Sequence, residues 1–332
     1  MMNRHMPLWM QMMMKKNKYD DLGRRFLLDK NLPYDYLNYD HFQYCLGLCS
    51  MTEEFNSLLK KIEEKYEGEP NNFIHEYASV RDVMINDILD MPAYKEFIEM
   101  DMNKFAVPKQ EVTSNNIFKQ DNIGKMFVSI DLSKANFQAM KYVNPELVKN
   151  QDTYQDFVGQ YSGNDYIKNS KYTRQVVFGK LNPKRQITVE RYLIEKVKDL
   201  VGNIPGCQLV SICNDELIYQ AKDRVLFYPS KLYGIEQNVK SELGIDVHVE
   251  CFILHGYDFK YKEPGDSKFA FYRKVIYFPY MKHELKCVPG PYRKIVDKFF
   301  LGKPVEEMDM LALFDGCIVK FLEKFKIEEI HE

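Results

Sequence analysis

The chain has 332 residues, 45% of them hydrophobic, which is enough for two lobes or for one domain of about 200 residues with additions. Its formal net charge is −2, so the molecule as a whole is not a polycation that coats nucleic acid, and any phosphate-binding surface has to be local. The seven cysteines include no CxxC pair, and no apolar run approaches the roughly 18 residues that span a bilayer, so we expect a cytoplasmic protein with reduced thiols and no membrane partner.

The first part of the chain has a helical pattern. The methionine-rich start, residues 1–16, lacks a small-residue cleavage site, so we expect a flexible or loosely docked arm rather than a signal peptide. Ser50 and Glu53 match a capping box ahead of an amphipathic helix. A second helix is expected from about residue 72 to residue 89. We therefore interpret residues 1–105 as a helical N-terminal region.

The character of the sequence changes after this region. Residues 126–131, MFVSID, predict a short buried strand that runs into a turn, and a helix is expected over 132–143. A polar, irregular stretch at 150–170 precedes a helical region over 172–200, which is broken or bent at Pro183. A strand followed by helices is therefore the first half of the central region.

A hairpin completes this central region. The apolar segments QLVSIC and ELIYQ flank Asn214 and Asp215, which predicts two strands joined by a tight turn. Several β-like runs follow, and a final helix is expected over about 305–325. The predicted fold class is α+β: a helical N-terminal region, a βαββ core within residues 106–250, and a β-containing C-terminal region over 251–332.

Acidic residues stand at the ends of the predicted strands. A carboxylate at the end of the first strand, Asp131, is open to a ligand at the edge of the sheet, although Asp131 or Ser133 could equally cap the next helix. Asp215 and Glu216 lie at the tip of the hairpin, where Asn-Asp is also a common turn pair. A βαββ core would bring carboxylates from different strands together, as two-metal nucleotidyl transfer requires. We therefore expect Asp131 and Asp215 to hold two Mg²⁺ or Mn²⁺ ions.

Basic residues lie between and after these acids. From Tyr166 to Val189 there are six lysines and arginines and no acid, which suits a triphosphate or a nucleic-acid backbone, although a solvated basic helix face gives the same pattern. Near residue 273, lysine and arginine alternate with aromatic residues, which predicts either a thumb-like surface or a half-exposed sheet. His248 and His283 are expected to be structural. The candidate nucleic-acid-binding residues are Lys171, Lys184, Arg185, Arg273 and Lys274.

Three segments carry a resemblance to a known family. FVSIDLSKANFQAM resembles motif A of the family A DNA polymerases, and QLVSICNDELIYQ resembles their motif C, with Asn214 where the family has His. RQVVFGKLNP is similar to the core of motif B. The sequence departs from the family at Asn136, where motif A carries a Glu, and at Asn182–Pro183, where motif B ends in Tyr-Gly. The resemblance covers at most residues 125–230.

The resemblance implies a divergent, pared-down polymerase palm of phage or plasmid type. It makes Asp131 and Asp215 the metal ligands and Glu216 the neighbouring catalytic acid. The residues that it places near the incoming nucleotide are Arg174, Phe178, Lys180, Ser133 and Asn136.

The expected function is that of a template-directed nucleotidyltransferase, similar to a DNA polymerase, in the cytoplasm of the cell or of a phage host. Its partners would be a nucleic-acid primer-template, nucleoside triphosphates and a replication partner protein. The departures from motifs A and B favour an alternative, a catalytically inactive palm-derived protein that binds nucleic acid or assists replication.

Overall fold

The computed structural model describes residues 17–108, 112–221, 229–261, 269–321 and 324–330, and the methionine-rich start lies outside them. The chain divides into two compact units, each made of three separate stretches. Unit 1 combines residues 1–84, 161–177 and 288–325, and unit 2 combines residues 85–160, 178–287 and 326–332. This division differs from the three consecutive segments expected from the sequence, because contacts between distant stretches define the units.

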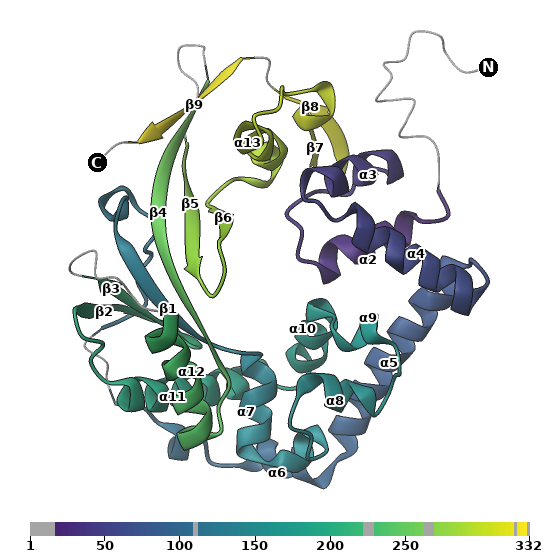
Figure 1. Cartoon of the computed structure of the whole chain (residues 1–332). Helices are drawn as coiled ribbons and strands as arrows, with labels where there is room; N and C mark the ends of the chain where they lie inside the picture. The colour runs from purple at the N-terminus through teal and green to yellow at the C-terminus, as the bar shows by residue number, and fades with distance from the viewer. Residues whose placement is uncertain (1–16, 109–111, 222–228, 262–268, 322–323, 331–332) are drawn as a thin grey trace. The chain divides into compact units, whose positions relative to one another are not determined.

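Unit 1 is mainly helical, as expected for the N-terminal region. Its described helices are α2 (Asp20–Asp29), α3 (Tyr39–Leu48), α4 (Thr52–Tyr66), most of α5 (Pro70–Asp90), α9 (Asp165–Lys168), most of α10 (Lys171–Gly179) and α13 (Arg293–Phe300) (Figure 1). Apolar side chains at helical spacing, such as Phe55, Leu58 and Ile62, are buried, which confirms the amphipathic pattern. The predicted capping box is wrong, because α4 begins after Met51 without a side-chain cap and Ser50 adopts a left-handed conformation, with φ of 56°.

The C-terminal part of unit 1 differs from the expected final helix. The short 3-10 helix η5 (Glu307–Met310) is followed by β7 (Leu311–Phe314) and β8 (Cys317–Lys320), which form an antiparallel hairpin. Gly316, with φ of 76°, provides the left-handed turn between them. The apolar residues of this segment therefore alternate on a pleat instead of lining one side of a helix.

Unit 2 is built on an antiparallel sheet. Its strands are β1 (Met126–Leu132), β2 (Cys207–Ile212), β3 (Glu216–Ala221), β4 (Val247–Tyr261), β5 (Phe269–Phe278), β6 (Lys282–Lys286) and β9 (Phe325–Ile330). The strand order is β2-β3-β1-β4-β5-β6, and β9 also pairs with β4. Because β3 lies between β1 and β2 and runs antiparallel to both, β1, the helices that follow it and β2 form a split βαβ arrangement.

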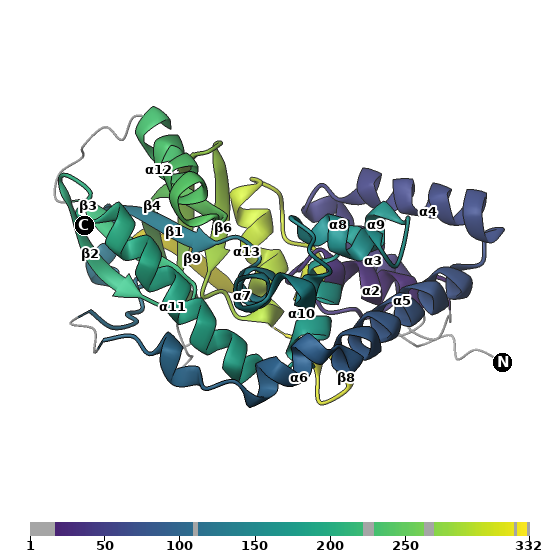
Figure 2. The same cartoon turned by 90° about the horizontal axis from the view of Figure 1, so that it is seen from below.

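Helices cover one face of this sheet. The described helices of unit 2 include α6 (Pro92–Glu99), α7 (Ala135–Val143), α8 (Tyr154–Gly159), α11 (Pro183–Val201) and α12 (Pro229–Leu243) (Figure 1; Figure 2). The predicted break at Pro183 is confirmed, because this proline is the first residue of α11. The stretch at 150–170, expected to be irregular, contains the short helices α8 and α9.

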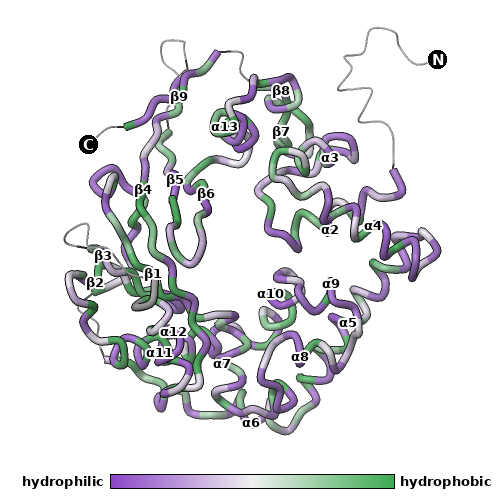
Figure 3. The backbone as a smooth tube through the Cα atoms, viewed as in Figure 1, coloured by the Kyte–Doolittle hydropathy of each residue, from purple (hydrophilic) through white to green (hydrophobic). Residues whose placement is uncertain are grey.

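The alternation of side chains along β1 decides which of them meet the helices. Val128, Ile130 and Leu132 are buried in the core shared with α7, α11 and α12. Phe127 lies on the other face, where its ring stacks on that of Phe252 at 5.6 Å between centroids. Hydrophobic and hydrophilic residues also succeed one another along β4 and β5 (Figure 3). Asp131 therefore shares the face of Phe127, which is turned away from the helices and which Ile117 and Phe118 cover around Phe127.

Candidate active site

The sequence-predicted acids meet at one end of the sheet. Asp131, near the end of β1, is directly paired with Glu216, the first residue of β3. Asp215 lies in the turn between β2 and β3, and its carbonyl oxygen accepts a hydrogen bond of 2.8 Å from the amide of Leu132. The turn itself is closed by the Cys213 amide, which donates to the Glu216 carbonyl at 2.8 Å. Backbone pairing thus fixes the three acids beside one another.

Asp131 and Asp215 form no ion pair within the described part of the chain, and both are half-buried. His248, which is paired with Asp131 across β1 and β4, is the cation that acts on Asp131. Burial, as the largest cause, and the negative charges of Asp215 and Glu216 together raise the pKa of Asp131 to about 7. Burial likewise raises the pKa of Asp215. Such crowding of acids at one place favours the arrival of a cation.

Glu216 is held by a hydrogen bond from its own sheet. The Ser129 hydroxyl donates to Oε1 of Glu216 at 2.6 Å. Ser129 is buried, and it lies two residues before Asp131 on the same face of β1. This bond leaves the other oxygen of Glu216 available and fixes the direction of the carboxylate beside Asp131.

A further acid, Glu190, belongs to the helical layer and interacts electrostatically with Asp215. Glu190 lies on α11 and is buried, with 6% of its surface exposed. Burial raises the pKa of Glu190 to about 7, and the charge of Asp215 contributes to the rise. Sequence reasoning missed this residue, because Glu190 stands among polar residues of an amphipathic helix and has no motif of its own.

On β4, the strand that pairs with β1 opposite β3, the acid Glu250 is neutralised by cations. His248 on β4 is directly paired with Asp131, and its Nε2 lies 3.4 Å from Oε1 of Glu250. Lys282 reaches the same carboxylate oxygen at 3.0 Å, and Lys274 also forms an ion pair with Glu250. Although burial alone would raise the pKa of Glu250, hydrogen bonds from His248 and Lys274 lower it. This ion-pair network therefore keeps Glu250 ionised, with both of its carboxylate oxygens in contact with cationic side chains.

His248 was expected to be a structural histidine, yet it adjoins the candidate site. The hydrogen bond with Glu250 raises the pKa of His248, and the positive charge of its ring lowers that of Asp131. The sequence signal was the segment HVEC, which places His248 and Glu250 two residues apart on one face of a strand. Recognising it would have required knowing that β4 pairs with β1.

The predicted nucleotide-binding residues are divided by the structure. Lys180 is exposed, and Ser133 and Asn136 are half-buried close to the end of β1. Phe178 is fully buried, and its ring packs edge-on against Phe137 at 6.4 Å between centroids. The structure therefore corrects the stacking role expected for Phe178, because a core ring has no free face for a base. Arg174 lies on α10 in unit 1.

The predicted nucleic-acid-binding residues are also divided. Lys171 and Lys184 are exposed. Arg185 instead donates hydrogen bonds to the carbonyl oxygens of Phe97 and Met100, at 3.0 and 2.8 Å, and so closes the end of α6. Lys274 is buried in the ion pair with Glu250, and this pairing removes its ammonium group from contact with a ligand. Arg273 is half-buried on β5.

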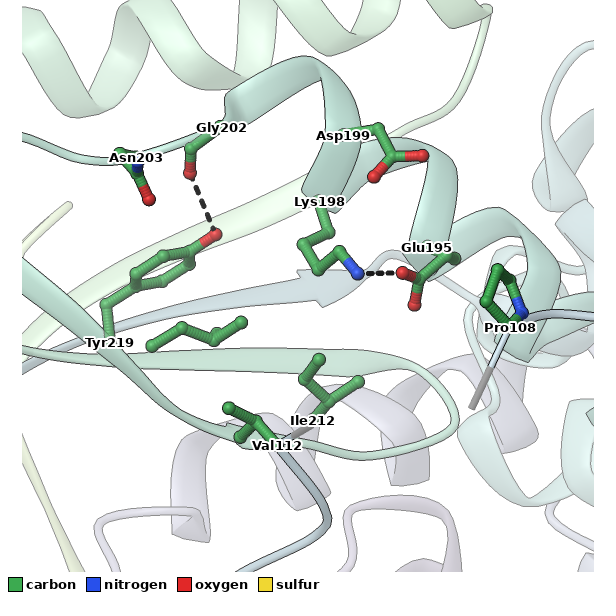
Figure 4. Close-up of a pocket in the computed structure, with 10 residues that line it drawn as sticks. Pro108, Val112, Glu195, Lys198, Asp199, Gly202, Asn203, Ile212 and Tyr219 are labelled. Atoms are coloured by element: carbon green, nitrogen blue, oxygen red, sulfur yellow. Dashed lines mark hydrogen bonds and ion pairs between the residues drawn. The ribbon is translucent and has the colours of Figure 1, made fainter. Parts of the chain in front are cut away.

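A pocket of roughly 560 Å³ lies elsewhere in unit 2, at the end of α11 and beside β2 and β3 (Figure 4). Tyr219 closes part of it by donating a hydrogen bond of 3.4 Å to the Gly202 carbonyl. Lys198 is paired with Glu195 on the opposite wall. None of the sequence-predicted site residues lines this pocket, whose charged lining residues are Glu195, Lys198 and Asp199.

The side chains of Asp131 and Asp215 can be compared with the ligands that the expected metal ion requires. Asp131 and Asp215 offer carboxylate oxygens, the donors that Mg²⁺ and Mn²⁺ prefer. Within the described ranges, no group of three or more His, Cys, Asp or Glu side chains is arranged to hold a metal ion. Two carboxylates alone are fewer ligands than such a group has, so the binding of Mg²⁺ or Mn²⁺ by Asp131 and Asp215 stays a prediction.

Comparison of the chain with protein-family models, with curated proteins and with solved structures found no match. Among the described helices, none is both long and apolar enough to cross a membrane. The function therefore has to be inferred from the fold of unit 2 and from the chemistry of its acids.

Proposed function

We propose that unit 2 is the palm of a template-directed nucleotidyltransferase, which extends a nucleic-acid primer with nucleoside triphosphates. One observation carries the proposal: Asp131, near the end of β1, and Asp215, in the turn before the neighbouring strand β3, lie close together, and neither forms an ion pair among the described residues. Two-metal transfer of a nucleotide needs such a pair. Asp131 lies on the face of the sheet that is turned away from the helices and is half-buried there, so we assign the Asp131 end of that face to the substrates.

The residues have distinct roles in this proposal. Asp131 and Asp215 hold the ions, and Glu216, oriented by Ser129, is the neighbouring acid. Bound Mg²⁺ or Mn²⁺ would lower the pKa of the primer hydroxyl and neutralise the leaving pyrophosphate. Lys180 is the cation of unit 2 that we assign to the triphosphate, on the basis of the motif B resemblance.

Primer extension tests the proposal. A labelled primer on DNA and on RNA templates would be incubated with each nucleotide set and with Mg²⁺ or Mn²⁺. Wild type, Asp131→Asn and Asp215→Asn would be compared with Asp199→Asn, an exposed acid on α11 that serves as the matched control. We expect extension by wild type and by the control only. Extension that survives in either site variant would overturn the assignment of the ions.

The buried position of Phe178 favours the second candidate, a protein that binds nucleic acid without catalysis. A palm that lacks the stacking ring holds the incoming base less firmly, and Asn182–Pro183 depart from motif B at the same place. Wild type that binds primer-template but extends it under none of these conditions would establish this alternative.

A further inference from the structure

The turn between β5 and β6 exposes large apolar side chains. Tyr280 is 73% exposed and Met281 64% exposed, and Tyr277, just before the turn, is 45% exposed. Exposed aromatic and methionine side chains that gather in one short segment are unusual on a protein surface, and they indicate a site of contact with another molecule. The turn, residues 279–281, is called the β5–β6 tip below.

The sheet register places the β5–β6 tip near the candidate active site. Val128, Cys251 and Phe278 form one row across β1, β4 and β5. Asp131 lies three residues further along β1, in the direction in which β5 runs past Phe278 into the tip. The tip therefore reaches the level of Asp131, at a lateral distance of about 10–14 Å, or two to three strand spacings.

Strand pairing and ion pairs connect the β5–β6 tip with Asp131. Asp131 is paired with His248, His248 contacts Glu250, and Glu250 accepts the ammonium group of Lys282, the residue that follows the tip. The ion pair from Lys282 to Glu250 anchors the base of the hairpin to β4. A molecule that contacts the tip is thus held beside the acids by a fixed part of the same sheet.

The charges around the tip favour a polyanion. Lys282 and Lys286 on β6 form ion pairs with Glu250 and Glu284, and the buried Lys274 on β5 also pairs with Glu250, so three lysines share two carboxylates and only the two on β6 are within reach of a ligand. His248 adds a further cation when it is protonated. The β4–β6 side of the sheet is therefore net positive, whereas the β1–β3 side carries the unneutralised acids. Aromatic side chains next to lysines are the combination that binds single strands of nucleic acid.

We infer that the β5–β6 tip is the docking surface for the 3′-terminal nucleotides of the primer strand. Tyr280 and Met281 contact the bases or sugars, and Lys282 lies beside the backbone. This inference rests on the proposed function, because it assigns the side from which the primer end approaches Asp131. It names a surface that the motif resemblance, which ends near residue 230, does not include.

Binding measured without catalysis tests the inference. The affinity for a fluorescent primer-template would be determined by anisotropy, with chelator and without nucleotides, for wild type, for the double variant Tyr280→Ala with Met281→Ala, and for Tyr233→Ala. Tyr233 is the matched control, since it is 56% exposed and lies on α12, in the helical layer behind the sheet. We expect the double variant to bind about 10-fold or more weakly and the control to bind as wild type does.

A photoreactive group at the primer 3′ end gives a second readout on the unaltered protein, and crosslinks should map to residues 277–282. Unchanged affinity of the double variant, an equal loss in the control, absence of binding by wild type, or a tip that instead holds two copies of the chain together in sedimentation would each overturn the inference. Failure of the proposed function looks different: wild type would then bind in a tip-dependent way and extend nothing.

Discussion

Two carboxylates, one in each unit, show how differently this chain treats a buried acid. In unit 1, Asp29 is 6% exposed and accepts hydrogen bonds from the hydroxyls of Tyr77 and Ser170, at 2.5 and 2.7 Å. In unit 2, Asp131 is surrounded instead by Asp215 and Glu216. Burial raises the pKa of both, but hydroxyl donors counteract it at Asp29, whereas neighbouring acids add to it at Asp131. The hydrogen bonds at Asp29 stabilise the fold, whereas the like charges around Asp131 repel one another, and a bound cation would reduce this repulsion.

The largest expected effect separates activity from stability. Asp131→Asn and Asp215→Asn should each reduce primer extension more than about 100-fold, because several kcal/mol of charge stabilisation depend on the ions. In the absence of metal, the same changes should increase the free energy of unfolding by about 1–2 kcal/mol, since they remove a repulsion. Steady-state extension and denaturant unfolding with chelator measure the two quantities. A site variant that loses stability as well as activity would contradict the comparison.

The same kind of change at Asp29 should do the opposite. Asp29→Ala removes the acceptor that the Tyr77 and Ser170 hydroxyls share and leaves these two donors only the hydrogen bond between the two hydroxyls, so we expect a loss of about 2–4 kcal/mol in the stability of unit 1. Hydrogen exchange of α2 and α5 would report it. Asp165→Ala is the control: this acid is 75% exposed in its pair with Lys168, and its removal should change stability by less than about 0.5 kcal/mol.

Stability of metal-free unit 2 should depend on pH through these acids. The folded pKa of Asp131, about 7, lies above its ordinary value of 3.8, so the folded state binds the proton more tightly. Its contribution to stability is therefore complete below about pH 4 and is lost as the pH rises through about 7. Glu190, also with a pKa of about 7, acts in the same direction. Unfolding at pH 5 and pH 8 should show a smaller difference in Asp131→Asn than in wild type, and equal differences would refute the assignment.

The smallest effect concerns the orientation of Glu216. Ser129→Ala removes the hydrogen bond of 2.6 Å and should reduce extension about 2- to 10-fold, with about 1 kcal/mol lost in stability. Ser129→Thr retains a hydroxyl on a β-branched side chain that suits a strand, so it should recover most of the activity. Equal activities of the alanine and threonine variants would show that the hydroxyl has no orienting role.

Local pattern was sufficient for the central elements. The apolar run before Asp131 predicted β1, and the turn residues around Asp215 predicted the β2–β3 hairpin. The break at Pro183 predicted the boundary between α10 and α11. The structure has all of these. The final helix over 305–325 was wrong, because the period of the apolar residues there is compatible with a strand once Gly316 allows a turn.

Long-range pairing was beyond the sequence pattern. His248 and Glu250 belong to the site only because β4 pairs with β1, more than a hundred residues earlier in the chain. Phe178 was expected to stack on the incoming base because of the motif B resemblance, but its ring is buried, packed against Phe137 and Phe157. Which side of a helix faces the core depends on partners that no local spacing specifies.

The most direct test of the central claim, that the crowded acids are a cation site, is the binding of Mn²⁺ alone, measured by calorimetry. Wild type and Asp199→Asn should bind the ion with equal affinity, and the double variant Asp131→Asn with Asp215→Asn should bind it at least about 10-fold more weakly. Equal binding by all three proteins would contradict the account, because the repulsion at Asp131 would then have no bearing on the cation.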